Sequence, residues 1–141
     1  MAERSRLEII LKNQPGETQR LFPALEQFAT EHALPAKAVQ AADLALEEHV
    51  TNVLNHGYTD GAVHEISVRF SCIDRVFEIQ VEDDGRPFNP LEQPEVDTSI
   101  PLEERPVGGL GVHLMRKFMD ALEYQRVGER NVLRMTKRLE V

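Results

Sequence analysis

A glutamate and an asparagine four residues apart, Glu48 and Asn52, form the first pair in this chain whose types and spacing could do chemistry. They fall in LALEEHVTNVLNHGY, where apolar residues recur at steps of three and four and predict a helix from after Pro35 to about His56. One turn apart on that helix, the carboxylate can accept a nucleophile's proton while the amide oxygen ligates a hard cation such as Mg²⁺. Taken alone, the pair fits a solvated polar helix face at least as well.

A second segment, VEDDGRPFNP, places acidic residues and a glycine directly after an apolar strand pattern. Asp83 could accept a hydrogen bond from an exocyclic amine, and Gly85 has no side chain to keep a flat ring away. Because a carboxylate only accepts, it favours adenine, whose amino group donates, over guanine, whose oxygen at that position accepts. A turn rich in Asp, Gly and Pro is the competing interpretation.

Three glycines in four residues open a third segment, VGGLGVHLMRKFMD, which continues with an apolar and basic helical pattern. A P-loop would need lysine and Ser or Thr after the last glycine, and a dinucleotide-binding turn would need a third spaced glycine in a βαβ unit. The sequence has neither context. What remains is a helix N-terminus whose free N–H groups an anion can approach past Gly109 and Gly111, or a plain turn from loop to helix.

The elements around these segments must position them. The hydrophobic periodicity predicts strands near residues 7–11, 66–70, 77–81, 122–127 and 131–139, and helices near 18–32, 36–56 and 109–121. Residues 89–107 form a long loop rich in proline and acids, typical of a functional cover. Hairpins with segregated helices favour one α+β domain over residues 1–141: a two-layer α/β sandwich with a mixed, mostly antiparallel sheet and helices on one face.

The composition limits the partners. The 141 residues carry a formal net charge of -8 at pH 7, so the overall field repels nucleic-acid phosphates and anionic membrane surfaces. Cys72 is the only cysteine, which excludes an intrachain disulfide and a multi-thiolate zinc site and is typical of a reducing compartment. No segment approaches the roughly 18 apolar residues of a membrane span. We expect a soluble, cytoplasmic protein that binds neither nucleic acid nor membrane directly.

The three segments together, in this order, resemble one family. E-x-x-x-N on a helix, D-x-G-x-P-F after a strand and G-G-L-G before a helix are similar to the ATP-binding domain of the gyrase, heat-shock chaperone, histidine kinase and mismatch-repair ATPases, which has the Bergerat fold. Within that superfamily, EHVTNVLNHGY, VEDDGRPFNPL, GGLGVHLMRKFMD and the terminal NVLRMTK most resemble the small serine-kinase anti-sigma factors. The resemblance covers roughly residues 5–138.

The resemblance implies roles for the first four site residues. Glu48 matches the family's catalytic base, and Asn52 matches its Mg²⁺-binding asparagine. Asp83 and Gly85 match the adenine-recognising aspartate and its glycine.

Further positions follow from the same resemblance. Gly109 and Gly111 lie in the phosphate-facing glycine segment, Thr136 falls where the family often has an adenine-pocket threonine, and residues 89–107 match the nucleotide lid. Arg105 is the only basic side chain of that lid, so we infer that it is the candidate cation for the γ-phosphate; a surface arginine without a role is the equal alternative.

The activity implied by this resemblance is that of a protein serine/threonine kinase that uses ATP and Mg²⁺. It would bind a sigma factor as an anti-sigma factor, phosphorylate a serine of an anti-anti-sigma (STAS-domain) protein, and form a homodimer. Two other functions stay open. An ATP-gated binding module would need Asn52 and Asp83 equally, whereas a simple ATPase would use Glu48 on water. His49 and Arg86 are bulkier than the family's usual residues, but neither removes a required group.

Overall fold

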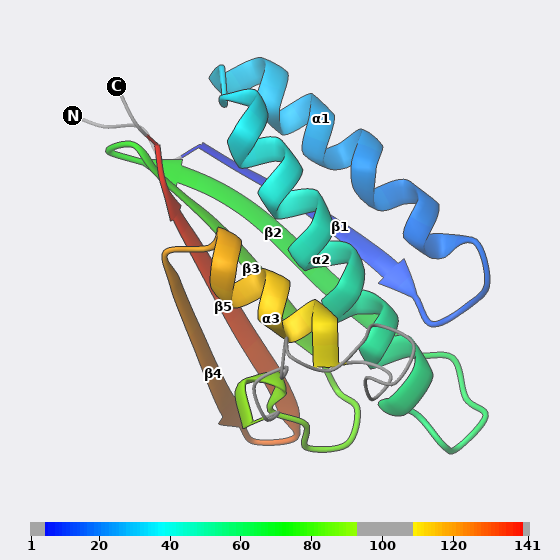
Figure 1. Cartoon of the computed structure of the whole chain (residues 1–141). Helices are drawn as coiled ribbons and strands as arrows, with labels where there is room; N and C mark the ends of the chain where they lie inside the picture. The colour runs from blue at the N-terminus through cyan, green and yellow to red at the C-terminus, as the bar shows by residue number, and fades with distance from the viewer. Residues whose placement is uncertain (1–4, 93–108, 140–141) are drawn as a thin grey trace.

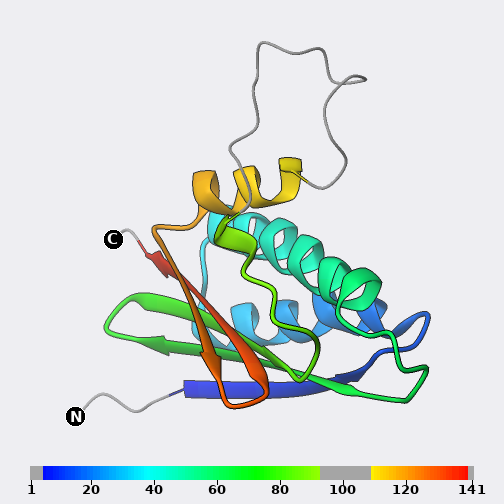
Figure 2. The ribbon, with the colours of Figure 1, turned by 90° about the horizontal axis from the view of Figure 1, so that it is seen from below.

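In the part of the chain that the structure describes, a five-stranded antiparallel sheet carries three α-helices on one face (Figures 1 and 2). The computed structural model describes residues 5–92 and 109–139. The strand order is β1-β2-β3-β5-β4, and neighbouring strands run antiparallel. The predicted α+β sandwich with helices on one face is therefore confirmed, and the sheet is antiparallel throughout the described strands rather than mixed.

The first three strands come from the N-terminal segment and a tight hairpin. Their bounds are β1 Ser5–Lys12, β2 Glu65–Ile73 and β3 Val76–Asp83. Asp74 and Arg75 connect β2 to β3, with φ of 50° and 65° respectively, and such a turn of two left-handed residues matches the twist of a two-residue hairpin. The strands predicted near residues 66–70 and 77–81 therefore form an antiparallel hairpin.

The C-terminal hairpin completes the sheet. It comprises β4 Ala121–Val127 and β5 Arg130–Arg138, and β5 pairs with β3, so Asn131 lies directly opposite Asp83. The predicted end of the third helix near Ala121 is wrong, because α3 spans Gly109–Phe118 and Ala121 already begins β4. The amide of Asp120 donates to the carbonyl of Thr136 at 2.9 Å. Through this hydrogen bond the chain leaves the helix and joins the sheet.

The α-helices of the described segments cover the sheet, with α2 between α1 and α3 (Figure 1). A short 3-10 turn, Glu17–Arg20, leads into α1 Leu21–His32, and α2 spans Ala36–His56. Pro23 is the third residue of α1, in the first turn, where its missing N–H would have had no partner inside the helix. The helix therefore begins two residues before this proline. No described helix is long and apolar enough to cross a membrane.

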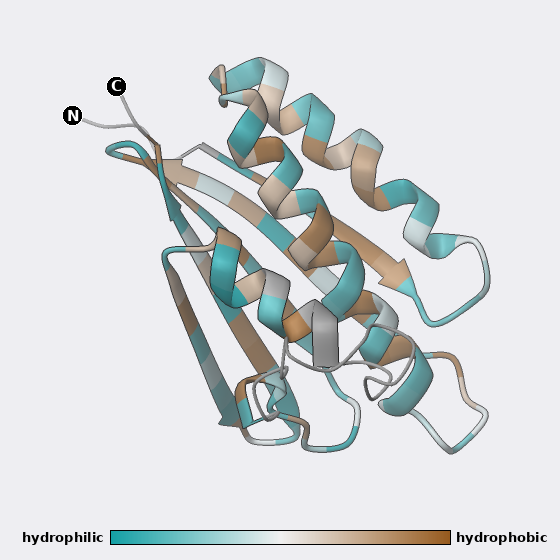
Figure 3. Ribbon diagram, viewed as in Figure 1, coloured by the Kyte–Doolittle hydropathy of each residue, from teal (hydrophilic) through white to brown (hydrophobic). Residues whose placement is uncertain are grey.

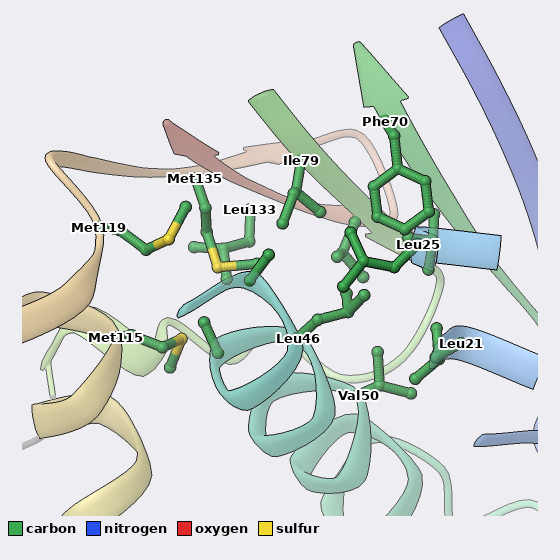
Figure 4. Close-up of a cluster of buried hydrophobic side chains, with 14 of the residues drawn as sticks. Leu21, Leu25, Leu46, Val50, Phe70, Ile79, Met115, Met119, Leu133 and Met135 are labelled. Atoms are coloured by element: carbon green, nitrogen blue, oxygen red, sulfur yellow. The ribbon is translucent and has the colours of Figure 1, made fainter. Parts of the chain in front are cut away.

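The core lies between the helices and the inward face of the sheet. Figure 3 shows apolar and polar residues alternating along the strands, as expected when one face is buried. Phe28 of α1 packs against Phe70 and Phe77, with ring centroids 5.8 and 5.7 Å away. Met115 of α3 and Leu133 and Met135 of β5 lie around α2 in the same core (Figure 4). This packing fixes the end of α2 next to the ends of β3 and β5.

Candidate functional site

The candidate site lies where the C-terminal end of α2, the end of β3 and the start of β5 meet. A small cavity of about 10 Å³ opens there, and its lining residues come from all three elements and from the loop after β3: Asn52, Val53, Gly57, Asp83, Arg86, Phe88 and Asn131. A space of this size holds about one water molecule. A purine can therefore enter only if the loop or its side chains move.

Asp83, the last residue of β3, is the carboxylate among the residues that line this cavity. Its side chain is 2% exposed, and its Oδ1 accepts two hydrogen bonds of 2.9 Å, from the amide of Gly85 and from Nδ2 of Asn131. Burial raises the pKa of Asp83, and these two hydrogen bonds oppose that rise. No described residue donates to Oδ2, so Oδ2 is the acceptor that a ligand could use.

Gly85 brings the loop after β3 against the end of α2. A Cβ at this position would lie 2.8 Å from the carbonyl oxygen of Gly57 and 3.0 Å from Oδ1 of Asp83. The distance to the backbone oxygen is shorter than a side-chain carbon allows, and the distance to Oδ1 is tighter than most contacts of a Cβ atom, so the close approach requires glycine. The amide of Arg86 donates to Gly57 at 2.9 Å, and its Nε donates to the carbonyl of His56 at 2.9 Å. Arg86 therefore caps the C-terminal end of α2 while lining the cavity.

Asn131 is a site residue that the sequence reasoning missed. It is 5% exposed, and its Nδ2 donates to Asp83 and, at 2.8 Å, to the carbonyl of Arg86. Its Oδ1 accepts from the hydroxyl of Tyr124 at 2.5 Å and from the amide of Phe88 at 3.3 Å. The available signal was the strand alternation: Asn131 shares the inward phase of Leu133 and Met135, where a polar residue is unusual.

Thr136, in contrast, does not join this group. It pairs with Glu78, whereas Asp83 pairs with Asn131 at the other end of the same two strands. Thr136 also alternates with the inward Leu133 and Met135, so its side chain is on the face of the sheet away from the helices. The assignment of Thr136 to the adenine pocket is therefore corrected, and Asn131 is the polar residue of β5 beside Asp83.

Glu48 and Asn52 lie one turn apart on α2 and contact each other. Nδ2 of Asn52 lies 3.5 Å from Oε1 of Glu48, and both side chains are half-buried. Asn55, one turn further along α2, is exposed. Asn52 also lines the cavity. Since its amide nitrogen faces Glu48, its amide oxygen is left for a cation. The described residues hold no group of three His, Cys, Asp or Glu that could bind a metal, so Asn52 would have to share a cation with ligand oxygens.

The glycine segment opens a helix as predicted, since Gly109 and Gly111 lie in the first turn of α3. Arg116, further along α3, donates to the carbonyl of Leu91, in the short 3-10 turn Pro90–Glu92. Arg105 and residues 93–108 lie outside the described part of the chain. The predicted lid is thus described only at its beginning, residues 89–92, which α3 contacts.

Comparison with known proteins agrees with this geometry. The chain is 29% identical over 112 residues to the serine/threonine-protein kinase BtrW of Bordetella bronchiseptica, covering 79% of both chains. It is 29% identical over 124 residues to the serine-protein kinase RsbW of Bacillus subtilis, covering 84% of this chain and 77% of RsbW. The predicted resemblance to serine kinases of this type is confirmed.

A solved structure supports the fold. The structure of the RsbU and RsbW domains of a Mycobacterium tuberculosis protein superposes with a TM-score of 0.68 at 14% identity, covering 96% of this chain and 32% of that one. The sequence model of the histidine kinase-like ATPase domain family matches residues 11–137. This range contains Glu48, Asn52, Asp83 and Asn131. The chain therefore belongs to the histidine kinase-like ATPase domain family.

Proposed function

We propose that this protein is an anti-sigma factor with serine/threonine protein kinase activity that uses ATP and Mg²⁺, and that its substrate is a serine of an anti-anti-sigma protein with a STAS domain. One observation carries most weight: Asp83 is buried and lines the same cavity as Asn52, its Oδ1 accepts from two donors, and no described residue donates to its Oδ2. A single acceptor oxygen, at a position where only a glycine backbone fits, suits the amino group of adenine.

The residues fit the nucleotide at both of its ends. Oδ2 of Asp83 can accept from the adenine amine, whereas the oxygen of guanine would face a carboxylate that cannot donate. The amide oxygen of Asn52 suits Mg²⁺, a hard cation that prefers oxygen ligands. The first N–H groups of α3, at Gly109 and Gly111, have no partner inside the helix and suit phosphate oxygens. Bound Mg²⁺ would neutralise charge on the transferred phosphoryl group.

In this mechanism Glu48 is the base. Its carboxylate takes the proton of the serine hydroxyl, while Asn52 contacts Oε1 and restricts the rotamer of Glu48. The half-buried position of Glu48 on α2 allows a substrate hydroxyl to reach it from solvent. Transfer to the partner would add a charge of roughly -1.5 to -2 at the interface and weaken binding there.

The partners follow from the relatives together with the chemistry. BtrW and RsbW are named as kinases of serine or serine/threonine in proteins, which supports a protein substrate rather than water. The net charge of -8 disfavours a direct contact with nucleic acid. We place the protein in the cytoplasm, where a sigma factor and ATP are both available, and include a homodimer in the proposal.

Phosphoryl transfer tests the proposed function directly. The protein is incubated with radiolabelled ATP, Mg²⁺ and a STAS-domain protein from the same organism, in parallel with a partner whose acceptor serine is replaced by alanine. The proposal expects label on the unmodified partner only, lost with EDTA. ATP-dependent binding of the partner without label would instead support the ATP-gated binding module. Release of free phosphate unaffected by the partner would support a simple ATPase.

A further inference from the structure

We propose that Tyr124 and Asn131 are positioning residues that set the base specificity of the nucleotide site by holding Asp83 with its Oδ1 occupied and its Oδ2 without a donor among the described residues. This inference rests on the proposed function and concerns how that site distinguishes adenine from guanine. It assigns a role to β4, which carries Tyr124 and supplies no residue to the cavity itself.

The carboxamide of Asn131 makes four hydrogen bonds. Nδ2 has two N–H groups, which go to Asp83 and to the carbonyl of Arg86, and Oδ1 has two lone pairs, which accept from Tyr124 and from the amide of Phe88. The residue is 5% exposed, so no bulk water competes for these groups. A buried, fully satisfied polar network is stiff, because breaking one bond leaves a buried group unpaired.

The partners also determine which way the amide faces. The amide of Phe88 can only donate, while the carbonyl of Arg86 and the ionised carboxylate of Asp83 can only accept. A rotation of the amide by 180° would place its oxygen against two acceptors. In this orientation the hydroxyl of Tyr124 donates to Oδ1 at 2.5 Å, the shorter of the two contacts on that oxygen, and fills its second lone pair.

This orientation controls the chemistry of Asp83. With Asn131 and the amide of Gly85 both donating to Oδ1, the carboxylate cannot rotate without losing two hydrogen bonds. The same donors favour the ionised form and oppose the rise in pKa that burial causes. An ionised Asp83 accepts only and so selects adenine, whereas a protonated Asp83 could donate to the oxygen of guanine. Weakening the network should therefore lower discrimination as well as affinity.

A second contact from β4 acts on the same loop. Nη1 of Arg126 donates to the carbonyl of Gly85 at 2.9 Å, two residues along the strand from Tyr124. The β4–β5 hairpin thus holds the loop from Asp83 to Phe88 at several points: through Asn131 at Asp83, Arg86 and Phe88, and through Arg126 at Gly85.

The test uses the full chain with Tyr124→Phe and Asn131→Ala, and Thr136→Val as the matched control on the other face of β5. Calorimetry gives the affinities for Mg·ATP and Mg·GTP from pH 6 to pH 8, and carboxyl ¹³C NMR of the nucleotide-free protein gives the pKa of Asp83. Tyr124→Phe should reduce the ATP-to-GTP affinity ratio roughly 3- to 10-fold, and Asn131→Ala about 10-fold or more. In both, the acid limb of ATP binding and the pKa of Asp83 should move to higher pH, with Thr136→Val unchanged.

The outcomes separate this inference from the proposed function. A wild-type protein that prefers ATP, with an unchanged preference and an unchanged Asp83 pKa in Tyr124→Phe and Asn131→Ala, overturns the positioning role alone. A wild-type protein without preference for ATP contradicts the proposed function and the specificity role together. Should Asn131→Ala fail to fold, as judged by circular dichroism, Tyr124→Phe decides, because it removes one hydroxyl and keeps the ring.

Discussion

A Cβ added to Gly85 would lie only 2.8 Å from the carbonyl oxygen of Gly57. The loop after β3 and the end of α2 therefore contact each other through their backbones. The contact joins the two segments that carry Asp83 and Asn52. A side chain at Gly85 would therefore push on the segments that carry these two residues.

Gly85→Ala should weaken ATP binding roughly 5-fold or more. The added methyl group must displace either the oxygen of Gly57 or Oδ1 of Asp83, and overpacking of this kind costs about 1–3 kcal/mol. Gly128→Ala is the control, since no atom lies within 4 Å of its Cβ position and only its positive φ of 59° is strained. The control should lower the melting temperature slightly and leave ATP affinity unchanged. Equal loss of ATP affinity in both variants would show that the close contact is unimportant.

Glu48→Gln should retain ATP binding and lower the rate of phosphoryl transfer by about 10²-fold or more. The amide keeps the shape and a hydrogen bond to Asn52 but is no longer a base. Glu47→Gln, at the exposed neighbouring position, is the matched control and should transfer at the wild-type rate. Transfer by Glu48→Gln at the rate of Glu47→Gln would remove Glu48 from the role of base.

The strongest local patterns were predictable from the sequence, because they depend on residues close in the chain. The stripe on α2 and the loop Asp83–Gly85 both appear where the periodicity and turn residues placed them. The end of α3 was not predictable: Met119 is buried and in helical phase with Met115, and only the long-range bond from Asp120 to Thr136 shows where the chain joins the sheet.

The sequence-based assignment of Thr136 to the adenine pocket failed for a similar reason. Thr136 and Asn131 lie on the same strand, but an odd separation of five residues places their side chains on opposite faces. The match to a family motif gave the strand but not the face. Only the register, in which Asp83 pairs with Asn131, identifies the residue beside the carboxylate.

Acid should destabilise the protein through His49. Burial lowers the pKa of this residue to about 4, whereas in an unfolded chain the pKa is about 6.5. The unfolded state therefore binds more protons between these values, and the stability contributed by neutral His49 is present above pH 6.5 and lost as the pH falls towards 4. The difference corresponds to roughly 3 kcal/mol. Urea unfolding of the wild type and His49→Leu should diverge in this window and run parallel above pH 7; parallel curves down to pH 4 would contradict it.

Raising the pH should weaken the hydrogen bonds of a second histidine, His64. His64 donates from Nδ1 to Asp84 at 3.1 Å and from Nε2 to Asp60 at 2.8 Å, so both nitrogens must carry protons. The hydrogen bonds to Asp84 and Asp60 raise the pKa of His64. Its contribution to stability is therefore complete below about pH 6.5 and is lost as the pH rises through the raised pKa.

Urea unfolding of His64→Gln measures this contribution. The stability gap between wild type and His64→Gln should be larger at pH 6 than at pH 9, and Asp60→Asn or Asp84→Asn should reduce its dependence on pH. A stability gap that widens with rising pH would contradict the assigned hydrogen bonds from protonated His64 to Asp84 and Asp60, because the neutral imidazole would then have to be the stabilising form.

The most direct test of the adenine site is the affinity of the wild type and Asp83→Asn for Mg·ATP and Mg·GTP, measured by calorimetry under identical conditions. We predict that the wild type binds ATP at least about 10-fold more tightly than GTP, and that Asp83→Asn loses most of this preference because its amide can donate as well as accept. Equal affinity of the wild-type protein for the two nucleotides would contradict the assignment of Asp83 to the base.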